Sequence, residues 1–443
     1  MKIQSIVAGL IVLIVCVLAP SVGIAQITSN AGGVVPTEYS SGNQDNIYVF
    51  CGKKGEFNAT LTATSPDAAT FEWLKYNTLT GTFDFFSSDL SGTTTSTISA
   101  LQDGAYRVNI TPTGGVVRTY TAWVFNNYIE TTAEITNSDC SSFTLNGTIE
   151  PATLTYVDLG TLQQKVLNKE PKAVWTAVGV SVGTGLPYQV FSPPTKNTDY
   201  TLIVTDRFGC SSEPVTVTYS SIVTKASFTY APEVQTHIDL SKHEAPLTMV
   251  FTNTSENGDP GKFQWFIYKD RAELILEALA YPGAVIDSFL IKLYDDSPTY
   301  KFEKPGAYNV KLVSQKTSAS TICYDTVHID QFIVIDESIL EAPNFFSPGN
   351  GDGINDNFVI RFFSMKTVKI SIFNRWGRIV HLYENNNVQG FGATWTSYPQ
   401  AVWDGKVGGK LAVPGVYYYV VDAMGRDDKR RKASGFVHLF REK

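Results

Sequence analysis

The sequence predicts an all-β chain divided into several sandwich domains, and three observations support this. Only 17% of the 443 residues are charged, whereas 12% are aromatic and 34 are glycine. Short runs of alternating apolar and polar residues are separated by turn residues about every 8–12 positions. Few stretches favour helix, and at roughly 100–200 residues per domain the length corresponds to several domains. The hydrophobic content excludes bulk disorder, and the net charge of −7 argues against a nucleic-acid-binding protein.

Residues 1–25 are predicted to form a secretory signal peptide. Lys2 supplies a positive charge, residues 3–19 are almost wholly apolar, and small residues stand at Gly23 and Ala25. This pattern predicts cleavage before Gln26; an uncleaved membrane anchor is the alternative. Cys16 does not follow a small residue, so lipidation is not expected. No later stretch reaches the roughly 18–20 apolar residues of a transmembrane helix.

Four cysteines remain after removal of the signal peptide: Cys51, Cys140, Cys210 and Cys323. They enter an oxidising compartment, where four cysteines allow three different pairings. Cys140 and Cys210 fall near the first and last strands of one predicted domain, so we predict a disulfide between them. Cys51 and Cys323 fall in different predicted domains and are expected to be buried free thiols.

Residues 26–126 and 127–223 are predicted to form two sandwich domains of similar layout. Each has alternating strand-like runs, a tryptophan (Trp73 or Trp175) and a later tyrosine (Tyr106 or Tyr200) in the same order. This is an internal repeat at the scale of a domain. Both segments resemble immunoglobulin-like domains, in which a buried tryptophan and a tyrosine corner occupy such positions.

Residues 224–341 resemble a PKD domain, an immunoglobulin-like sandwich of bacterial surface proteins. The resemblance is carried by Phe251–Ser255, by Trp265 and by the pattern over residues 302–310. It departs from the family at residues 267–270, where a Gly-Asp-Gly turn is expected. An insertion then follows, in which apolar residues at 272, 275, 276 and 279 predict a short amphipathic helix. The helix is interpreted either as a lid packed on the sandwich or as an element that docks a partner.

Residues 342–443 carry five separated motifs in order, and aromatic residues and turn glycines predict a small β-sandwich. Trp376, Trp395 and Trp403, with Tyr417–Tyr419, supply enough aromatic mass for its core. This segment resembles the gliding-motility-associated C-terminal domain of Bacteroidota, the type B sorting signal of the type IX secretion system. It departs in an extra Gly349 and in Val416, where the family often has threonine. The motif residues are Pro348, Asn350, Gly351, Asp352, Gly353, Asn355, Asp356, Arg375, Trp376, Gly377, Trp403, Asp404, Gly405, Gly415, Tyr417, Tyr418 and Arg441.

The loop over residues 350–357 alternates asparagine, aspartate and glycine, and two interpretations stay open. Oxygens of Asn350, Asp352, Asn355 and Asp356 are candidate calcium ligands. The alternative is a structural turn in which these side chains accept hydrogen bonds from the loop's own backbone. The bidentate glutamate that closes an EF-hand loop is missing. Calcium is the only cofactor for which the sequence offers candidates.

Charge separates the last domain from the rest of the chain. Residues 342–443 contain 14 Lys and Arg against 8 Asp and Glu, a net charge of +6, whereas residues 26–341 carry 20 against 34, a net charge of −14. Part of the excess is the run Lys429–Lys432 in a predicted hairpin turn. Such a run is interpreted either as a solvated tip or as a surface for an acidic partner.

No catalytic constellation is found in the sequence, so a non-enzymatic protein is expected. The five histidines lack the spacing of a zinc protease, and there is no Gly-x-Ser-x-Gly elbow, P-loop or Cys-x-x-Cys pair. The adjacent pairs Asp295–Asp296 and Asp427–Asp428 point to opposite faces if extended.

The resemblance implies export through the periplasm, recognition by the type IX translocon and delivery to the cell surface, with an outer-membrane protein of the PorP/SprF type as partner. The leading hypothesis is a surface interaction protein, adhesin-like or gliding-associated, whose partner is a surface protein or glycan. A compact accessory component of the secretion or gliding machinery is the alternative, since family members are mostly longer. A carbohydrate-binding surface module is a further alternative.

Overall fold

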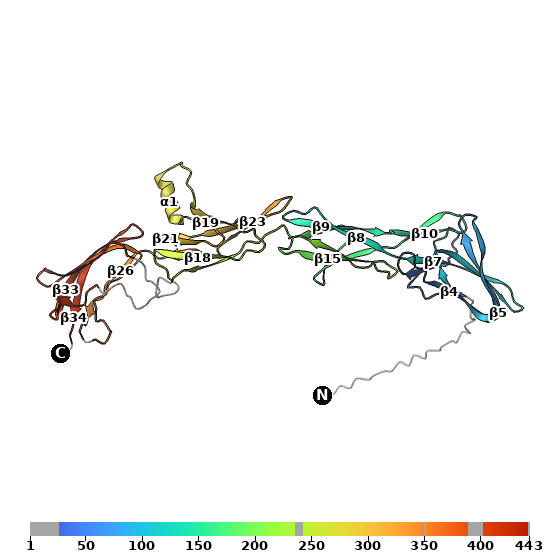
Figure 1. The fold of residues 1–443 in the computed structure, drawn as a ribbon, viewed down its shortest axis with the longest axis horizontal. Helices are drawn as coiled ribbons and strands as arrows, with labels where there is room; N and C mark the ends of the chain where they lie inside the picture. Colours follow the sequence, from blue (N-terminus) through green and yellow to red (C-terminus); the bar gives the residue numbers. More distant parts are fainter. Residues whose placement is uncertain (1–25, 235–241, 350, 389–401, 442–443) are drawn as a thin grey trace, which may run out of the picture. The chain divides into compact units, whose positions relative to one another are not determined.

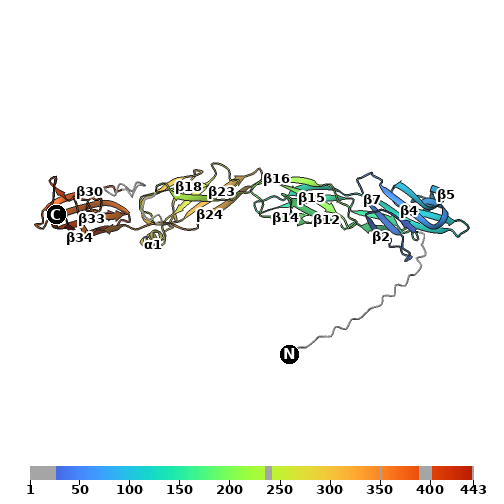
Figure 2. The same cartoon turned by 90° about the horizontal axis from the view of Figure 1, so that it is seen from below.

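The computed structural model describes residues 26–234, 242–349, 351–388 and 402–441, and Figures 1 and 2 show it as a ribbon. All but one of the regular elements in these ranges are β-strands, which confirms the predicted fold class. Two compact units are found: one holds most residues up to 219, and the other holds residues 220–443 with the short segments 139–141 and 192–197. The predicted signal peptide lies outside the described residues.

The first predicted domain forms one seven-stranded sheet in the order β1-β4-β6-β7-β3-β2, with β5 also paired to β4. β4 pairs with β1 at residues 62–64 and with β6 at residues 69–75, and a register shift against β5 separates the two parts. Such a bulge bends a strand, so one long strand serves both ends of the sheet. The strands are β1 (Gln26–Thr28), β2 (Gly33–Pro36), β3 (Asn46–Cys51), β4 (Ala59–Asn77), β5 (Thr82–Leu101), β6 (Gly104–Pro112) and β7 (Arg118–Asn127).

The second predicted domain contains a four-stranded sheet β13-β12-β15-β16, a three-stranded sheet β14-β9-β8 and the pair β10-β11. Its strands alternate buried and exposed residues, as sandwich strands do. They are β8 (Glu130–Thr136), β9 (Ser142–Glu150), β10 (Thr153–Val157), β11 (Gln164–Asn168), β12 (Lys172–Ala177), β13 (Val180–Thr184), β14 (Tyr188–Phe191), β15 (Thr198–Thr205) and β16 (Val215–Tyr219).

These two predicted domains share a hydrophobic core within the first unit. Ile47 and Trp123 belong to the same buried cluster as Phe143 and Trp175. The Tyr156 hydroxyl, on β10, also accepts a hydrogen bond of 2.7 Å from the backbone of Glu38. A second buried cluster, which includes Trp73 and Tyr106, lies wholly before residue 127. Residues before 127 therefore contribute to two cores, one of their own and one shared with the second predicted domain.

The disulfides differ from the prediction. Cys51 is bonded to Cys210, and Cys140 is bonded to Cys323, so the predicted Cys140–Cys210 disulfide and the predicted free thiols are wrong. Cys51 ends β3, and the shared core brings this strand end to the loop that contains Cys210, beside a hydrogen bond from Asn127 to Asp206. Cys140 lies between β8 and β9, in a segment that belongs to the second unit together with Cys323.

The third predicted domain has its own core around Trp265 and Phe251, between sheets β17-β18-β21 and β20-β19-β23-β24, and a further pair β22-β25. This is the layout expected of an immunoglobulin-like sandwich. Its strands are β17 (Phe228–Pro232), β18 (Leu247–Asn253), β19 (Gln264–Tyr268), β20 (Phe289–Leu293), β21 (Thr299–Phe302), β22 (Gly306–Tyr308), β23 (Val310–Thr317), β24 (Ile322–His328) and β25 (Ile333–Ile335).

The predicted helix is present as α1 (Arg271–Ala280), but it does not form a packed lid. None of its residues is buried, and its apolar side chains Ile275, Leu276 and Leu279 are exposed. The helix is attached to the sandwich through polar contacts instead. The Asp270 side chain caps the N-terminus of the helix and also accepts a hydrogen bond from Ala307 N, at the start of a neighbouring strand. Figure 1 shows the helix projecting from the sandwich.

The last domain has a separate core of its own, around Phe346, Phe358 and Trp403, on one face of a five-stranded sheet β27-β34-β33-β29-β30. Figure 2 labels three strands of this sheet, β30, β33 and β34, of which β33 and β34 are neighbours. β26 and β28 form a separate pair, as do β31 and β32. The strands are β26 (Ile339–Glu341), β27 (Phe345–Phe346), β28 (Arg361–Phe363), β29 (Met365–Phe373), β30 (Ile379–Asn385), β31 (Lys406–Val407), β32 (Lys410–Leu411), β33 (Gly415–Gly425) and β34 (Arg430–Leu439).

Tyrosine corners recur in three of the four predicted domains. The hydroxyls of Tyr106, Tyr308 and Tyr417 each donate to a backbone oxygen four residues upstream, at 3.0, 2.9 and 2.9 Å. Each of these tyrosines follows a glycine by two positions, and Tyr106 is one of the two tyrosines predicted at such a corner. These bonds fix the chain at the start of a late strand, as in immunoglobulin-like domains.

Candidate functional site

Two motif segments of the last domain, residues 403–405 and residues 415–418, meet at one tryptophan. Trp403 is fully buried, and its ring lies 5.2 Å from that of Phe346 and 4.9 Å from that of Tyr417. Its Nε1 donates to Lys406 O at 2.8 Å, so the polar edge is satisfied. Burial raises the pKa of Tyr417. Trp403 and Tyr417 are thus parts of one core, whereas Tyr418, also predicted in the core, is about half exposed because it lies on the other face of β33.

A second contact joins the motif at Pro348 to the motif at Gly405. Gly405 has a φ of 71°, and a Cβ at this position would lie 2.5 Å from Pro348 Cγ. Glycine is therefore required here both by the backbone conformation and by the space. Asp404 holds the same turn, since its Oδ1 accepts a bond of 3.0 Å from Lys406 N.

The loop after Pro348 is held by its own hydrogen bonds. Asp352 Oδ1 accepts from Ile354 N at 2.8 Å, and Asp356 Oδ2 accepts from Gly353 N at 3.0 Å. Asn355 has a positive φ of 54°, a conformation that asparagine tolerates, and its backbone oxygen accepts from Ser347 N. These bonds support the interpretation as a structural turn. Asn350 lies outside the described residues, and calcium binding by this loop stays a prediction.

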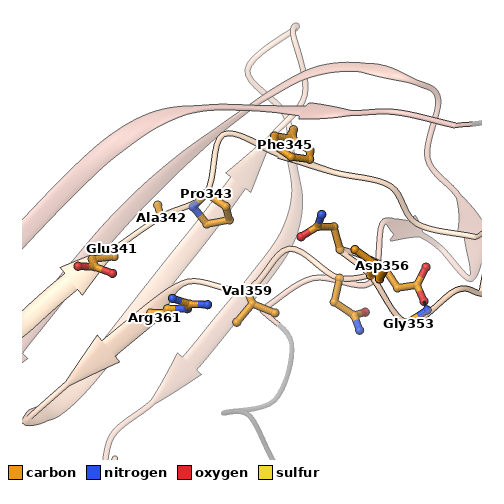
Figure 3. A pocket seen from close by; sticks show the side chains of 11 residues that line it. Glu341, Ala342, Pro343, Phe345, Gly353, Asp356, Val359 and Arg361 are labelled. Atoms are coloured by element: carbon orange, nitrogen blue, oxygen red, sulfur yellow. Dashed lines mark hydrogen bonds between the residues drawn. The ribbon is translucent and has the colours of Figure 1, made fainter. Parts of the chain in front are cut away.

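This loop forms one wall of a groove of about 890 Å³, shown in Figure 3. The opposite wall is the strand pair β26-β28, on which Glu341 stands opposite Arg361. Phe345, half exposed, adds an apolar surface. The groove is lined by the motif residues Gly353, Asn355 and Asp356 and also by Glu341 and Arg361, which belong to no predicted motif. It therefore lies between the loop and β26, the first strand of the domain.

The motif Arg375–Gly377 lies apart from this arrangement and is not part of the core. It forms the turn between β29 and β30, where Asn374 Oδ1 accepts from Trp376 N at 3.0 Å. The Trp376 side chain is 78% exposed, so its predicted role in the core is wrong. It lies in a hairpin turn, and among the described residues the Arg375 guanidinium lies over its ring, 5.1 Å from the ring centre. Trp395, also predicted in the core, lies outside the described residues.

Arg441 lies near the end of the described chain and has a structural partner. Its guanidinium donates to Ala412 O. Gly415, a motif glycine at the start of β33, has a φ of 149°, a backbone conformation that is strained for any residue with a side chain. Gly351, the remaining loop glycine, also has a positive φ, of 70°. These residues support the fold of the domain.

The basic run Lys429–Lys432 is largely neutralised within the chain. Lys429 pairs with Glu337 at 3.1 Å, Arg431 with Asp427 at 3.0 Å, and Arg430 with Asp422. The hydrogen bond from Arg430 lowers the pKa of Asp422. The exposed pairs of Lys429 and Arg430 contribute little stability each, whereas the pair of Arg431 with Asp427 is largely buried. Together the three pairs leave few free charges in this run. The main role of the run is therefore structural: its side chains hold the β33-β34 hairpin through intrachain ion pairs.

Within the described ranges, no group of three or more His, Cys, Asp or Glu residues is placed to hold a metal ion. In the same part of the chain, no helix has the length and apolar character needed to cross a membrane. The adjacent aspartates are used structurally: Asp427 accepts from Ser338 at 2.8 Å, and Asp296 accepts from Gly261 N at 2.8 Å.

Comparison with known families identifies the last domain. Residues 340–439 match the CHU_C type IX secretion signal domain, which confirms the resemblance of the C-terminal segment. The match covers the groove, the tryptophan core and every strand of the five-stranded sheet. The C-terminal domain is a type IX secretion signal domain, and such a signal directs export to the cell surface or beyond. A comparison with curated proteins finds no match.

Comparison with solved structures finds chains of low sequence identity that align over most of this chain. A tetra-tandem repeat from the extending region of a large adhesion protein is 12% identical, with 87% of this chain and 96% of that chain covered and a TM-score of 0.27. A Ca²⁺-stabilised, ice-binding adhesin of an Antarctic bacterium is 11% identical, with 94% and 100% covered and a TM-score of 0.23. Sidekick-1 immunoglobulin domains 1–5 are 12% identical, with 92% and 99% covered and a TM-score of 0.22. At scores this far below 0.5, the likeness carries no functional conclusion.

Proposed function

We propose that this chain is a non-enzymatic interaction protein of the bacterial cell surface, adhesin-like or gliding-associated, in a member of the Bacteroidota. Its last domain addresses it to the type IX translocon and to an outer-membrane protein of the PorP/SprF type. The observation that carries the proposal is the match of residues 340–439 to a secretion signal domain behind a series of β domains.

The β domains before the signal suit a role in binding rather than in catalysis. Their largest buried side chains are tryptophans and other aromatics that fill cores, and their tyrosine corners brace strands. The predicted signal peptide supplies entry to the periplasm, and the two disulfides suit an oxidising compartment outside the cytoplasm. The ligand is a surface protein or a glycan.

Deletion of residues 340–443 tests the export step. The truncated protein should accumulate in the periplasm, while the full chain reaches the cell surface, as measured by protease accessibility on intact cells and by fractionation. As the converse test, residues 340–443 are fused to a periplasmic reporter, with the unfused reporter as control. Surface delivery of the truncated protein, or retention of the fused reporter, would contradict the proposal.

A further inference from the structure

The third domain and the last domain are connected only by residues 336–338. β25 ends at Ile335, β26 begins at Ile339, and both domains belong to the second compact unit. Domains of one chain are expected to move against each other unless an interface holds them. In this structure both domains and the connection between them share a set of polar contacts, which centre on two residues of the last domain, Ser364 and Arg426.

Ser364, between β28 and β29, is the first of these centres and is only 1% exposed. Its hydroxyl donates a hydrogen bond of 2.8 Å to Asp336 O and accepts one of 3.1 Å from Ala245 N. Its N–H donates to Glu244 Oε2 at 3.2 Å, and its backbone oxygen accepts from Arg426 N at 2.8 Å. The hydroxyl and the N–H of Ser364 are thus bonded to the third domain and to the connection.

The partners of Ser364 are part of the fold of the third domain. Ala245 belongs to the core around Trp265, and Glu244 beside it is 2% exposed. Asp336 N donates to His243 O at 2.9 Å, so the connection is also bound to the segment that leads into β18. Buried polar groups that lose their partners cost free energy. Neither domain can therefore shift without breaking several of these bonds together.

Arg426, in the turn between β33 and β34, is the second centre. Its side chain is 9% exposed and pairs at 2.8 Å with Glu303, directly after β21 of the third domain. In the same turn Asp428 pairs with Lys304 at 3.1 Å, and Ser338 of the connection also bonds to this turn. We call the contacts of Ser364 and Arg426 with the third domain and the connection the joint.

The burial of the joint distinguishes it from a simple tether between independent domains. Exposed ion pairs such as Lys304–Asp428 contribute little stability. Ser364 and Glu244 are buried against each other, and a guanidinium as buried as that of Arg426 is costly without its partner. The buried contacts, rather than the exposed pairs, are therefore expected to link the stability of the two domains.

We propose that the joint makes the third domain and the last domain one cooperative unit, so that unfolding of the third domain destabilises the last domain. A chain whose third domain is not folded then presents a weakened secretion signal, and the joint acts as a folding check on export. The folding check rests on the proposed function, whereas the coupling between the two folds does not.

Hydrogen exchange of the full-length protein, followed by mass spectrometry, tests the coupling. In a cooperative unit the slowest amides of both domains exchange through the same opening. Leu312→Ala removes a fully buried side chain from the core of the third domain, and we expect exchange in β29 and β33 to rise at least about tenfold. Leu61→Ala, the same change in a core of the first domain, is the matched control and should leave these strands unchanged.

Two further variants sharpen this test. If Leu312→Ala does not fold, the smaller change Ile267→Val in the same core should raise exchange in β29 and β33 about threefold. Ser364→Ala with Glu303→Ala removes one partner from each half of the joint. In that background Leu312→Ala should no longer speed exchange in the two strands.

Surface delivery tests the folding check. The delivered fraction of the protein should fall severalfold for Leu312→Ala and stay normal for Leu61→Ala. Normal delivery of Leu312→Ala, with coupled exchange, would overturn the folding check.

The remaining outcomes separate this proposal from the proposed function. Unchanged exchange in β29 and β33 of Leu312→Ala or Ile267→Val, or an equal rise for Leu61→Ala, would overturn the coupling through the joint and leave the export function standing. Delivery without residues 340–443 would overturn the proposed function and the folding check, but not the coupling that hydrogen exchange measures.

Discussion

At the scale of single residues, one buried tryptophan marks a core in each predicted domain. Trp73, Trp175, Trp265 and Trp403 are all fully buried, one in each predicted domain. The burial of such residues can be predicted from the sequence, because a large ring within an alternating strand has few stable positions outside a core. Trp376 shows the limit: its motif sits in a turn, and turn residues gain burial only when another element covers them.

Gly405 offers a direct test at this scale. The change Gly405→Ala should lower the free energy of unfolding by about 2–4 kcal/mol, because it adds the strain of a positive φ to an overlap with Pro348. Gly408→Ala is the matched control: its φ of 58° is similar, but no atom lies within 4 Å of the added Cβ. The control should cost only about 1 kcal/mol in chemical denaturation. Equal losses would show that Pro348 does not pack on Gly405.

At the scale of elements, periodicity predicted which segments are regular but not what covers them. The apolar positions of residues 272–279 correctly indicated a helix, yet its apolar side faces solvent because Asp270 and the ion pair Lys269–Glu277 attach its polar side. Likewise, Tyr417–Tyr419 are predicted in the core, yet Tyr418 is about half exposed because alternate residues of β33 face opposite sides of the sheet. A hydrophobic pattern indicates which face of an element would gain from burial, whereas the neighbouring elements decide whether that face is buried.

The attachment of α1 gives a prediction at this scale. Asp270→Ala removes the cap at Ala272 N and the bond to Ala307 N, at 2.8 Å each, and should cost about 1–2 kcal/mol of stability. Leu276→Ala should change stability by less than about 0.5 kcal/mol, because this side chain is exposed. Both values come from denaturant unfolding of the full protein. A loss above about 2 kcal/mol for Leu276→Ala would mean that the apolar side of α1 is packed.

At the scale of the whole molecule, the cores and cross-links do not follow the repeat that the sequence shows. Ile47 and Trp123, assigned to the first domain by the repeat, lie in one core with Phe143 and Trp175 of the second. The same sharing explains the disulfide from Cys51, since sequence spacing indicates which cysteines share a repeat but not which strand ends meet. Pairing by spacing therefore failed for all four cysteines.

Disulfide mapping tests this arrangement. Proteolysis of the exported protein without reduction, followed by mass spectrometry, should yield a peptide pair containing Cys51 and Cys210 and another containing Cys140 and Cys323. Replacing Cys51 and Cys210 with alanine should destabilise the first unit by about 2–5 kcal/mol, because the bond closes a long loop. A peptide pair joining Cys140 to Cys210 would contradict the shared core as described here.

The sequence by itself determined the fold class, the buried tryptophans, the tyrosine corner at Tyr106 and the sorting domain, because these depend on local periodicity and on motifs with narrow geometric requirements. The tertiary structure alone decided the disulfides, the core shared across residues 126 and 127, and the exposure of Val416, Tyr418 and Val420 on β33. These features depend on which segments meet after folding. Contacts of long sequence separation leave no trace in a local pattern, and so only the folded chain reveals them.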